Sequence, residues 1–201
     1  DWHEERRFTK DDPLATQPAI AISYQTPKRN DLEYFAMGLI DQALLQGDDS
    51  MLHQELVNHR GITGSIGGGI NFLGNMFNAQ DPLLWTASMI YDEKFEVDAV
   101  LDAFDDALEP LRKKPLDTAT FERTVTKARS AFYELLTSTV YPGFGRADFL
   151  SSFALIDGDA ARINAIDQQF SAITPKLVQT VARNYLRPDG RTVLSKIGRA
   201  H

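Results

Sequence analysis

The chain has 201 residues, of which 43% are hydrophobic and 24% charged, and these are the proportions of an ordinary globular protein with a buried core. The formal net charge of −7 argues against a nucleic-acid-binding protein, because such proteins usually carry a basic patch. The chain contains no cysteine, which excludes disulfides, thiolate zinc sites and a cysteine nucleophile.

We expect no membrane span, because no apolar run approaches the roughly 18 residues that a span requires. The apolar run from Phe35 to Leu45 is interrupted by Asp41. No signal peptide is visible, and the composition is compatible with a periplasmic or a cytoplasmic location in a bacterium.

In chain order, the first predicted element is a strand over residues 18–24, which is short, apolar and flanked by prolines. Asp31 is a candidate helix cap before a stripe of apolar residues that ends at Gly47. A second helix is predicted from Asp49 or Ser50 to Gly61.

The segment 62–79 alternates isoleucines with glycines and small polar residues, which predicts a long, glycine-weakened strand. Residues 83–91 are predicted to pair with it across a turn. The later elements are predicted to be helices over about 97–111, 117–137, 144–156, 159–169 and 174–185, and a closing strand over 191–197.

This order of elements predicts an α+β fold, with a mostly antiparallel β-sheet and helices packed on one face. We expect residues 1–201 to form a single domain, because no linker, low-complexity segment or internal repeat divides the chain.

His53 and His59 flank Glu55 and suggest a metal site at first sight. Residues six positions apart on a regular helix point about 120° away from each other, so the two imidazoles cannot hold one ion. The spacing also differs from the four-residue spacing of helical zinc motifs. Glu55 and His59 do share a helix face, as a surface pair would. We therefore expect no metal site and no cofactor in this chain.

Other candidate sites are equally incomplete. Gly67, Gly68 and Gly69 lack the lysine of a phosphate-binding loop, and no serine-nucleophile motif occurs. Asp105 and Asp106 are interpreted as exposed acids on the outer side of an amphipathic helix. The three cations at 112–114 are typical of a helix C-terminus. The residues alone therefore give no catalytic site.

A set of ordered segments resembles the pitrilysin/insulinase-type zinc peptidases, and more narrowly the second half-domain of a bacterial subunit akin to mitochondrial processing peptidase. The resemblance extends over about residues 5–199. The segments that carry it are PAIAISYQTP at 18–27, LLQG at 44–47, SMLHQELV at 50–57, RG at 60–61, TFER at 120–123, TPKLVQTVARNYLRP at 174–188 and RTV at 191–193.

The resemblance implies an absent first half-domain, or a partner peptidase subunit, that binds the catalytic zinc. It implies that this C-terminal half-domain of a larger subunit faces a chamber and helps to bind an extended peptide. Active members supply an arginine and a tyrosine, seven positions apart, beside the zinc. The matching positions here are Val57 and Gly64, whose side chains cannot donate a hydrogen bond to an oxyanion.

Two functional hypotheses follow from this resemblance. The chain is either a non-catalytic domain that shapes a peptidase chamber and binds peptide, or a structural scaffold related to the family without a proteolytic role. An intact zinc motif in the missing half would distinguish them. We also expect self-association into a homo-oligomer, because a separated half-domain would expose an apolar or strand-edge surface near residues 62–70.

Overall fold

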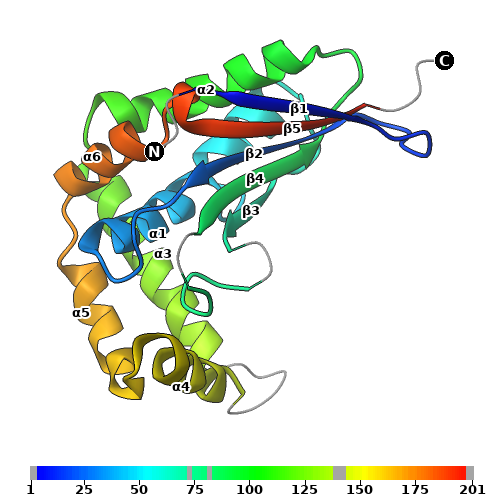
Figure 1. Ribbon diagram of the computed structural model, residues 1–201. Helices are drawn as coiled ribbons and strands as arrows, with labels where there is room; N and C mark the ends of the chain where they lie inside the picture. The colour runs from blue at the N-terminus through cyan, green and yellow to red at the C-terminus, as the bar shows by residue number, and fades with distance from the viewer. Residues whose placement is uncertain (1–3, 72–73, 81–82, 138–143, 198–201) are drawn as a thin grey trace.

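The computed structural model describes residues 4–71, 74–80, 83–137 and 144–197. A five-stranded sheet has the order β1-β5-β2-β4-β3 (Figure 1). Its strands are β1 (Arg6–Asp11), β2 (Ala19–Gln25), β3 (Gly67–Ile70), β4 (Leu84–Ile90) and β5 (Arg191–Ile197). β1 and β5 are parallel, whereas the other neighbours are antiparallel. The sheet is therefore mixed, and mostly antiparallel as predicted.

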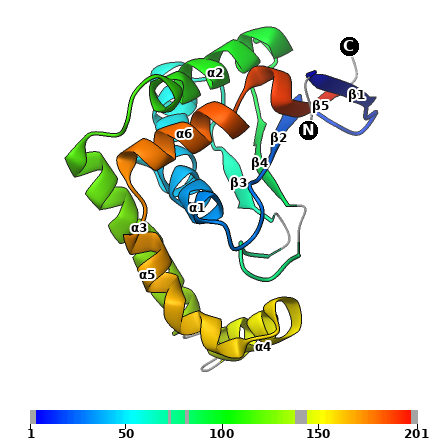
Figure 2. The same cartoon turned by 60° about the vertical axis from the view of Figure 1, so that its left-hand side comes forward.

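Six α-helices and three shorter helices accompany the sheet in the described residues. The α-helices are α1 (Leu32–Leu44), α2 (Val97–Lys113), α3 (Thr118–Leu136), α4 (Phe144–Asp157), α5 (Ile166–Ser171) and α6 (Pro175–Tyr185). The shorter ones are η1 (His53–His59), η2 (Ala160–Ala165) and η3 (Pro188–Gly190). Helices α1, α2 and α6 lie on one side of the sheet, and α3, α4 and α5 extend beyond them as an arm (Figure 2). The predicted α+β class is confirmed. No helix in the described parts of the chain is long and apolar enough to cross a membrane.

The two faces of the sheet differ because side chains alternate along β2 and β4. On the helix-covered face, Ile22, Tyr24 and Trp85 are fully buried. On the opposite face, which we call the open face, Ala21 and Ser88 are only partly buried. The core therefore lies between the sheet and its helices, and none of the helices in the described residues covers the second face (Figure 2).

The prediction of one long strand over 62–79 is wrong, because pairing with β4 is interrupted on both sides of β3. Before β3, the Thr63 hydroxyl accepts a hydrogen bond from the Ser65 amide and donates to the Ile90 carbonyl, which forms a turn. After β3, Asn71 has a φ of 58°, a left-handed conformation that ends an extended strand. Residues 72–73 of the predicted strand lie outside the described residues.

Phe77 fixes the helical arm to the core. Its ring lies 5.5–6.3 Å, between centroids, from the rings of Phe35, Phe132, Phe149 and Phe153 on α1, α3 and α4. This aromatic cluster joins α1 to α3 and α4, and edge and tilted ring contacts of this kind contribute stability beyond that of simple burial.

A buried ion pair also anchors the arm. The Arg29 guanidinium, in the loop before α1, donates to both oxygens of Asp157, at 3.2 and 2.8 Å, at the last residue of α4. Their side chains are 5% and 2% exposed. The pair therefore connects the start of α1 with the end of α4.

Local signals placed several other elements correctly. Asp117 caps α3 by accepting from the Thr120 amide, and Thr174 caps α6 in the same way through the Leu177 amide. β5 spans the predicted residues, whereas β1 was not predicted, because all six of its residues are exposed and no apolar alternation marks it.

Candidate functional site

The segment that contains the two histidines is a π-helix rather than a regular α-helix. The Arg60 amide donates to the Glu55 carbonyl at 3.0 Å, and the Ile62 amide donates to the Leu56 carbonyl at 2.8 Å. These bonds reach further back along the chain than α-helical ones. π-helical turns widen the helix and often lie at functional sites.

The π-helix does not turn the two histidines into a metal site. The His59 imidazole lies 3.2 Å from the Glu55 carboxylate, as expected from their four-residue spacing. His53 lies 3.8 Å from Asp48 instead. Within residues 4–71, 74–80, 83–137 and 144–197, no group of three histidine, aspartate or glutamate side chains is placed to hold a metal ion. The described residues thus offer no ligand set into which a catalytic zinc would fit.

The two candidate substrate-binding positions lie in different local settings. Val57 is half-buried within η1. Gly64 is exposed in the turn between η1 and β3, and a Cβ at this position would have no heavy atom within 4 Å. The space around Gly64 would therefore accept a Cβ, although glycine itself has no side chain to contact a substrate.

The turn around Gly64 is fixed to the sheet. Thr63 forms an isolated bridge with Tyr91, and the Asp92 amide donates to the Ile62 carbonyl at 2.9 Å. A hollow of about 400 Å³ lies beside this turn and is lined by Gly64, Ser65 and residues 90–92 among others. Gly64 therefore lies at a rigid rim rather than in a loose loop.

A second hollow, of about 450 Å³, lies on the open face and shares Ser65 with the first. A row of paired residues crosses it from β5 to β3: Leu194, Ala21, Ser88 and Gly67. Three of these four residues are small. The open face is consequently concave beside Gly64, with little side-chain bulk to block the backbone of a bound chain.

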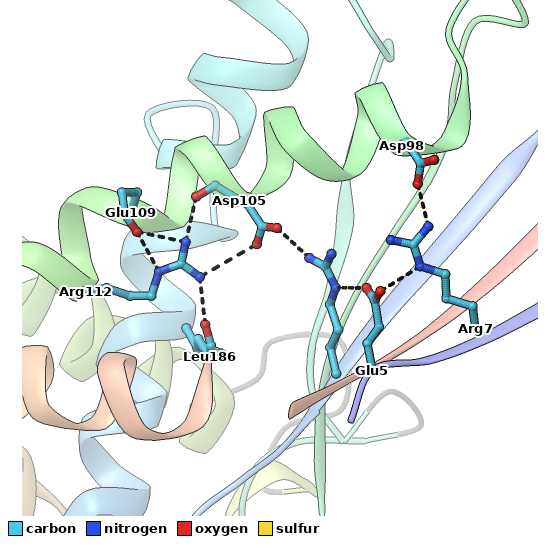
Figure 3. A network of polar contacts seen from close by, with 8 residues as sticks. Glu5, Arg7, Asp98, Asp105, Glu109, Arg112 and Leu186 are labelled. Atoms are coloured by element: carbon cyan, nitrogen blue, oxygen red, sulfur yellow. Dashed lines mark hydrogen bonds and ion pairs between the residues drawn. The ribbon is translucent and has the colours of Figure 1, made fainter. Parts of the chain in front are cut away.

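An ionic network closes the opposite side of the sheet, where β5 meets α2 (Figure 3). The Arg191 side chain is 4% exposed and donates to Glu5 at 2.6 Å and to Asp105 at 2.9 Å. Burial alone would lower the pKa of Arg191, but Tyr24, Glu5 and Asp105 raise it above its ordinary value. Arg7 donates to the other Glu5 oxygen at 2.7 Å.

The network continues along α2 and corrects one interpretation of the sequence. Arg112 donates to the Leu186 carbonyl at 3.0 Å and to the Asp105 carbonyl at 3.1 Å. Asp105 is therefore a half-buried partner of two arginines and not an exposed acid, whereas Asp106 is exposed as expected and pairs with Arg60. These partners lie up to 186 residues apart along the chain, so local spacing could not reveal them. Every charge in this network has a partner from the chain, which indicates a structural role.

The arrangement of a mixed sheet with one helical layer and one open face is that of an α+β domain. A family model described as the peptidase M16 inactive domain matches residues 3–128. The chain therefore belongs to the peptidase M16 family, as its inactive domain. The resemblance to pitrilysin-type zinc peptidases is confirmed. No curated protein matches the chain.

Solved structures share the fold at low sequence identity. A protease from Helicobacter pylori is 18% identical, with a TM-score of 0.80 over 97% of this chain and 44% of that chain. The inactive peptidase domain from Bordetella parapertussis is 22% identical, with a TM-score of 0.73 over 90% of this chain and 92% of that one. A chain of complex III from Candida albicans is 14% identical, with a TM-score of 0.74 over 96% of this chain and 45% of that chain. The present chain thus spans less than half of the Helicobacter protein and nearly all of the Bordetella domain.

Proposed function

We propose that this chain is the second, non-catalytic half-domain of a zinc metallopeptidase subunit, and that its open face forms part of a substrate chamber and binds an extended peptide. The observation that carries the proposal is the concave open face, with its row of small residues through Ala21, Ser88 and Gly67. Ligand sites are typically concave surfaces with few, well-placed polar groups.

The contribution of this half-domain is binding rather than chemistry. The zinc would come from the zinc-binding half-domain or from a partner peptidase subunit. Val57 and Gly64 correspond to the arginine and tyrosine of active members, and neither can stabilise a developing oxyanion. Dialysis of the chain against trace zinc should therefore leave no tightly bound stoichiometric ion. One equivalent bound through His53 or His59 would contradict this expectation.

Photo-crosslinking tests the binding surface directly. The chain is assembled with its zinc-binding half, zinc is removed with a chelator, and a photoreactive amino acid replaces Ser88 on the open face. An extended peptide should label this variant. The matched control carries the same amino acid at Asp102, an exposed position on α2. Equal labelling of both variants would contradict the proposal that the open face is the peptide-binding surface.

The alignment of Val57 and Gly64 is tested by restoring the family residues. The Val57→Arg/Gly64→Tyr variant is assembled with the zinc-binding partner and assayed on an unfolded peptide, with a chelator control. Single donors of this kind contribute about 100- to 1,000-fold in rate, so the variant should cleave faster than the parent complex. Chelator-sensitive cleavage by the unmodified subunit without a partner would show that the two positions are misaligned or dispensable.

A second candidate function is that of a structural scaffold without a proteolytic role. It is favoured by the fold likeness to a chain of complex III and by the loss of both donor residues. The open face would then bind another subunit or a second copy of this chain. A dimer or larger oligomer in sedimentation at high concentration, together with absence of peptide labelling at Ser88, would favour the scaffold. Peptide labelling by a monomeric half-domain would favour the chamber.

A further inference from the structure

A cavity of about 400 Å³ lies at the edge of the sheet, between β3 and the helical arm. We call it the β3–α3 cavity. α1 contributes Asp41, β3 contributes Gly69, and α3 contributes Ala128, Ala131 and Leu135 to its lining. It shares no lining residue with the hollow beside Gly64 or with the hollow on the open face, and is therefore a separate site.

Asp41 places a carboxylate in this cavity. The residue is 9% exposed. Its Oδ1 accepts from the Trp85 indole at 2.7 Å, and its Oδ2 accepts from the Gln46 side-chain amide at 3.0 Å. Both donors are neutral, so the hydrogen bonds orient the carboxylate without neutralising its charge.

The cations on the neighbouring helix are engaged elsewhere. Lys127 on α3 donates to the Asp49 carboxylate at 2.7 Å and to the Gln46 carbonyl at 2.8 Å. Arg129 on the same helix pairs with Asp167. None of the ion pairs found in the described residues includes Asp41. A buried ionised group without a partner is unfavourable, so this carboxylate differs from an ordinary structural acid.

Burial raises the pKa of Asp41 to about 6, against the Trp85 and Gln46 hydrogen bonds, which lower it. Above about pH 6 the carboxyl is therefore ionised in spite of its burial. A cation that entered the cavity at neutral pH would meet a negative charge in a partly dehydrated setting, where Coulomb attraction is stronger than in water.

A glycine in β3 leaves the carboxylate accessible from the cavity. A Cβ at position 69 would lie 3.6 and 3.7 Å from the two Asp41 oxygens and 3.5 Å from the Gln46 amide nitrogen. Any side chain there would occupy the space in front of the carboxylate. Gly69 therefore opens the approach to Asp41.

The other wall of the cavity is apolar. Ala128, Ala131 and Leu135 lie along α3 and present methyl groups. A small hydrated inorganic cation would gain nothing from this wall. A cation carried on a hydrocarbon stem would bury the stem against α3 and bring its charge to the carboxylate.

From this geometry we propose that the β3–α3 cavity binds a primary alkylammonium group, with Asp41 as its counter-ion and α3 as the contact for its stem. An ammonium fits better than a guanidinium, because each Asp41 oxygen already accepts one bond and a bidentate fork needs both oxygens free on one side. A lysine side chain, a charge on a flexible four-carbon stem, has the required form.

Two kinds of ligand carry a primary alkylammonium group: a peptide with a lysine side chain, and a free alkylamine. The inference concerns this cavity alone and does not depend on the peptidase role. Calorimetric titration of the full chain with three probes separates the sources. The probes are a capped Ala-Ala-Lys-Ala-Ala peptide, the same peptide with norleucine in place of lysine, and n-butylamine.

We expect the lysine peptide to bind about 10- to 100-fold more tightly than the norleucine peptide, as a charge-assisted contact would require. Butylamine binding as tightly as the lysine peptide identifies a free amine as sufficient. Much weaker butylamine binding identifies the peptide as the source. Equal binding of the lysine and norleucine peptides, or no binding of any probe, overturns the proposal.

Two variants test the named residues. Asp41→Asn keeps the shape of the side chain but removes its charge, and it should abolish the preference for lysine. Ala131→Leu keeps Asp41 and partly fills the cavity, and it should weaken binding of every probe. Asp102→Asn removes one exposed acid on α2 and should leave binding unchanged. A lysine preference that survives in Asp41→Asn contradicts the assignment.

Proton release gives a readout that a merely structural Asp41 would not produce. A bound ammonium lowers the pKa of Asp41 below about 6, so binding at pH 6 should release protons. Titrations in two buffers of different ionisation enthalpy measure this release. Affinity should rise from pH 5 to pH 7 and then level off. Binding without proton release at pH 6, or release that persists in Asp41→Asn, rules out Asp41 as the counter-ion.

Discussion

Two buried carboxylates of this protein have opposite surroundings. Asp157 ends α4, and its side chain is 2% exposed and bound by the Arg29 guanidinium. Asp41 lies within α1, is 9% exposed and is bound only by neutral donors. Both are removed from water, but only one of them receives a positive charge from the described chain.

The two surroundings shift the pKa values of the two carboxyl groups in opposite directions. Burial alone would raise the pKa of Asp157, but Arg29, Asn30 and the Arg162 charge together hold it below its ordinary value. Burial raises the pKa of Asp41 to about 6. A carboxylate with an internal cation therefore stabilises the fold, whereas one without such a partner is costly to the fold and available to an external cation.

The largest expected effect is the loss of the Asp157 charge. Asp157→Asn removes the carboxylate that the buried Arg29 guanidinium binds and should reduce the free energy of unfolding by about 3–5 kcal/mol. Urea unfolding at pH 7 measures this loss. Asp106→Asn, at an exposed pair with Arg60, should cost less than about 1 kcal/mol. Similar losses in both variants would mean that burial of the Arg29 pair has little energetic weight.

The Asp41→Asn variant should behave in the opposite way. A raised folded-state pKa contributes stability below the unfolded-state pKa, and this contribution is lost as the pH rises through about 6. One pKa unit corresponds to about 1.4 kcal/mol. Relative to the parent chain, Asp41→Asn should therefore gain about 3 kcal/mol between pH 3.5 and pH 7.5. Parallel stability curves for the two proteins would show that Asp41 is not destabilised by its burial.

Removal of neutral donors sharpens the comparison further. Trp85→Phe removes the indole donor and should raise the pKa of Asp41 by about one unit. Asn30→Gly removes a neutral donor from Asp157 and should shift the pKa of that carboxyl less, because Arg29 dominates there. NMR titration of the side-chain carboxyl carbons measures both shifts. A larger pKa shift at Asp157 than at Asp41 would contradict the expectation that neutral donors matter more for Asp41.

The smallest effect is expected from Lys127. Its ammonium is held by Asp49 and the Gln46 carbonyl, so Lys127→Met should change the pKa of Asp41 by less than about 0.3 units. The same NMR titration tests this expectation. A rise of a full unit would identify Lys127 as a counter-ion from the chain itself and would remove the contrast with Asp157.

Local patterns in the sequence were sufficient for much of the helical layer. Capping residues located the starts of α3 and α6, apolar periodicity located α1 and α2, and the order of the predicted elements gave the fold class. β1 carries no such pattern, because it is exposed along its whole length and its pairing depends on a strand that follows about 180 residues later. The limits of β3 were equally hidden, since they depend on the Thr63 turn and on the backbone of Asn71.

The candidate sites were harder to predict than the fold. Val57 and Gly64 were found only through the resemblance, and their role as substrate-binding positions stays a prediction. In the sequence, Asp41 was merely the charge that interrupts an apolar run. Its significance depends on Trp85, 44 residues away, and on the space in front of Gly69. Contacts between residues so far apart in the sequence cannot be predicted from the spacing of residues along the chain.

The position of β5 also has a consequence for the order of folding. β5 is the last strand of the described chain, yet it lies between β1 and β2 in the sheet. During synthesis, β2 and β4 can pair once residue 90 has left the ribosome, whereas β1 must wait for residues 191–197. Such long-range pairing is intrinsically slow. A nascent chain therefore carries an unpaired β2 edge until residues 191–197 emerge, and this edge is the surface that chaperones would bind.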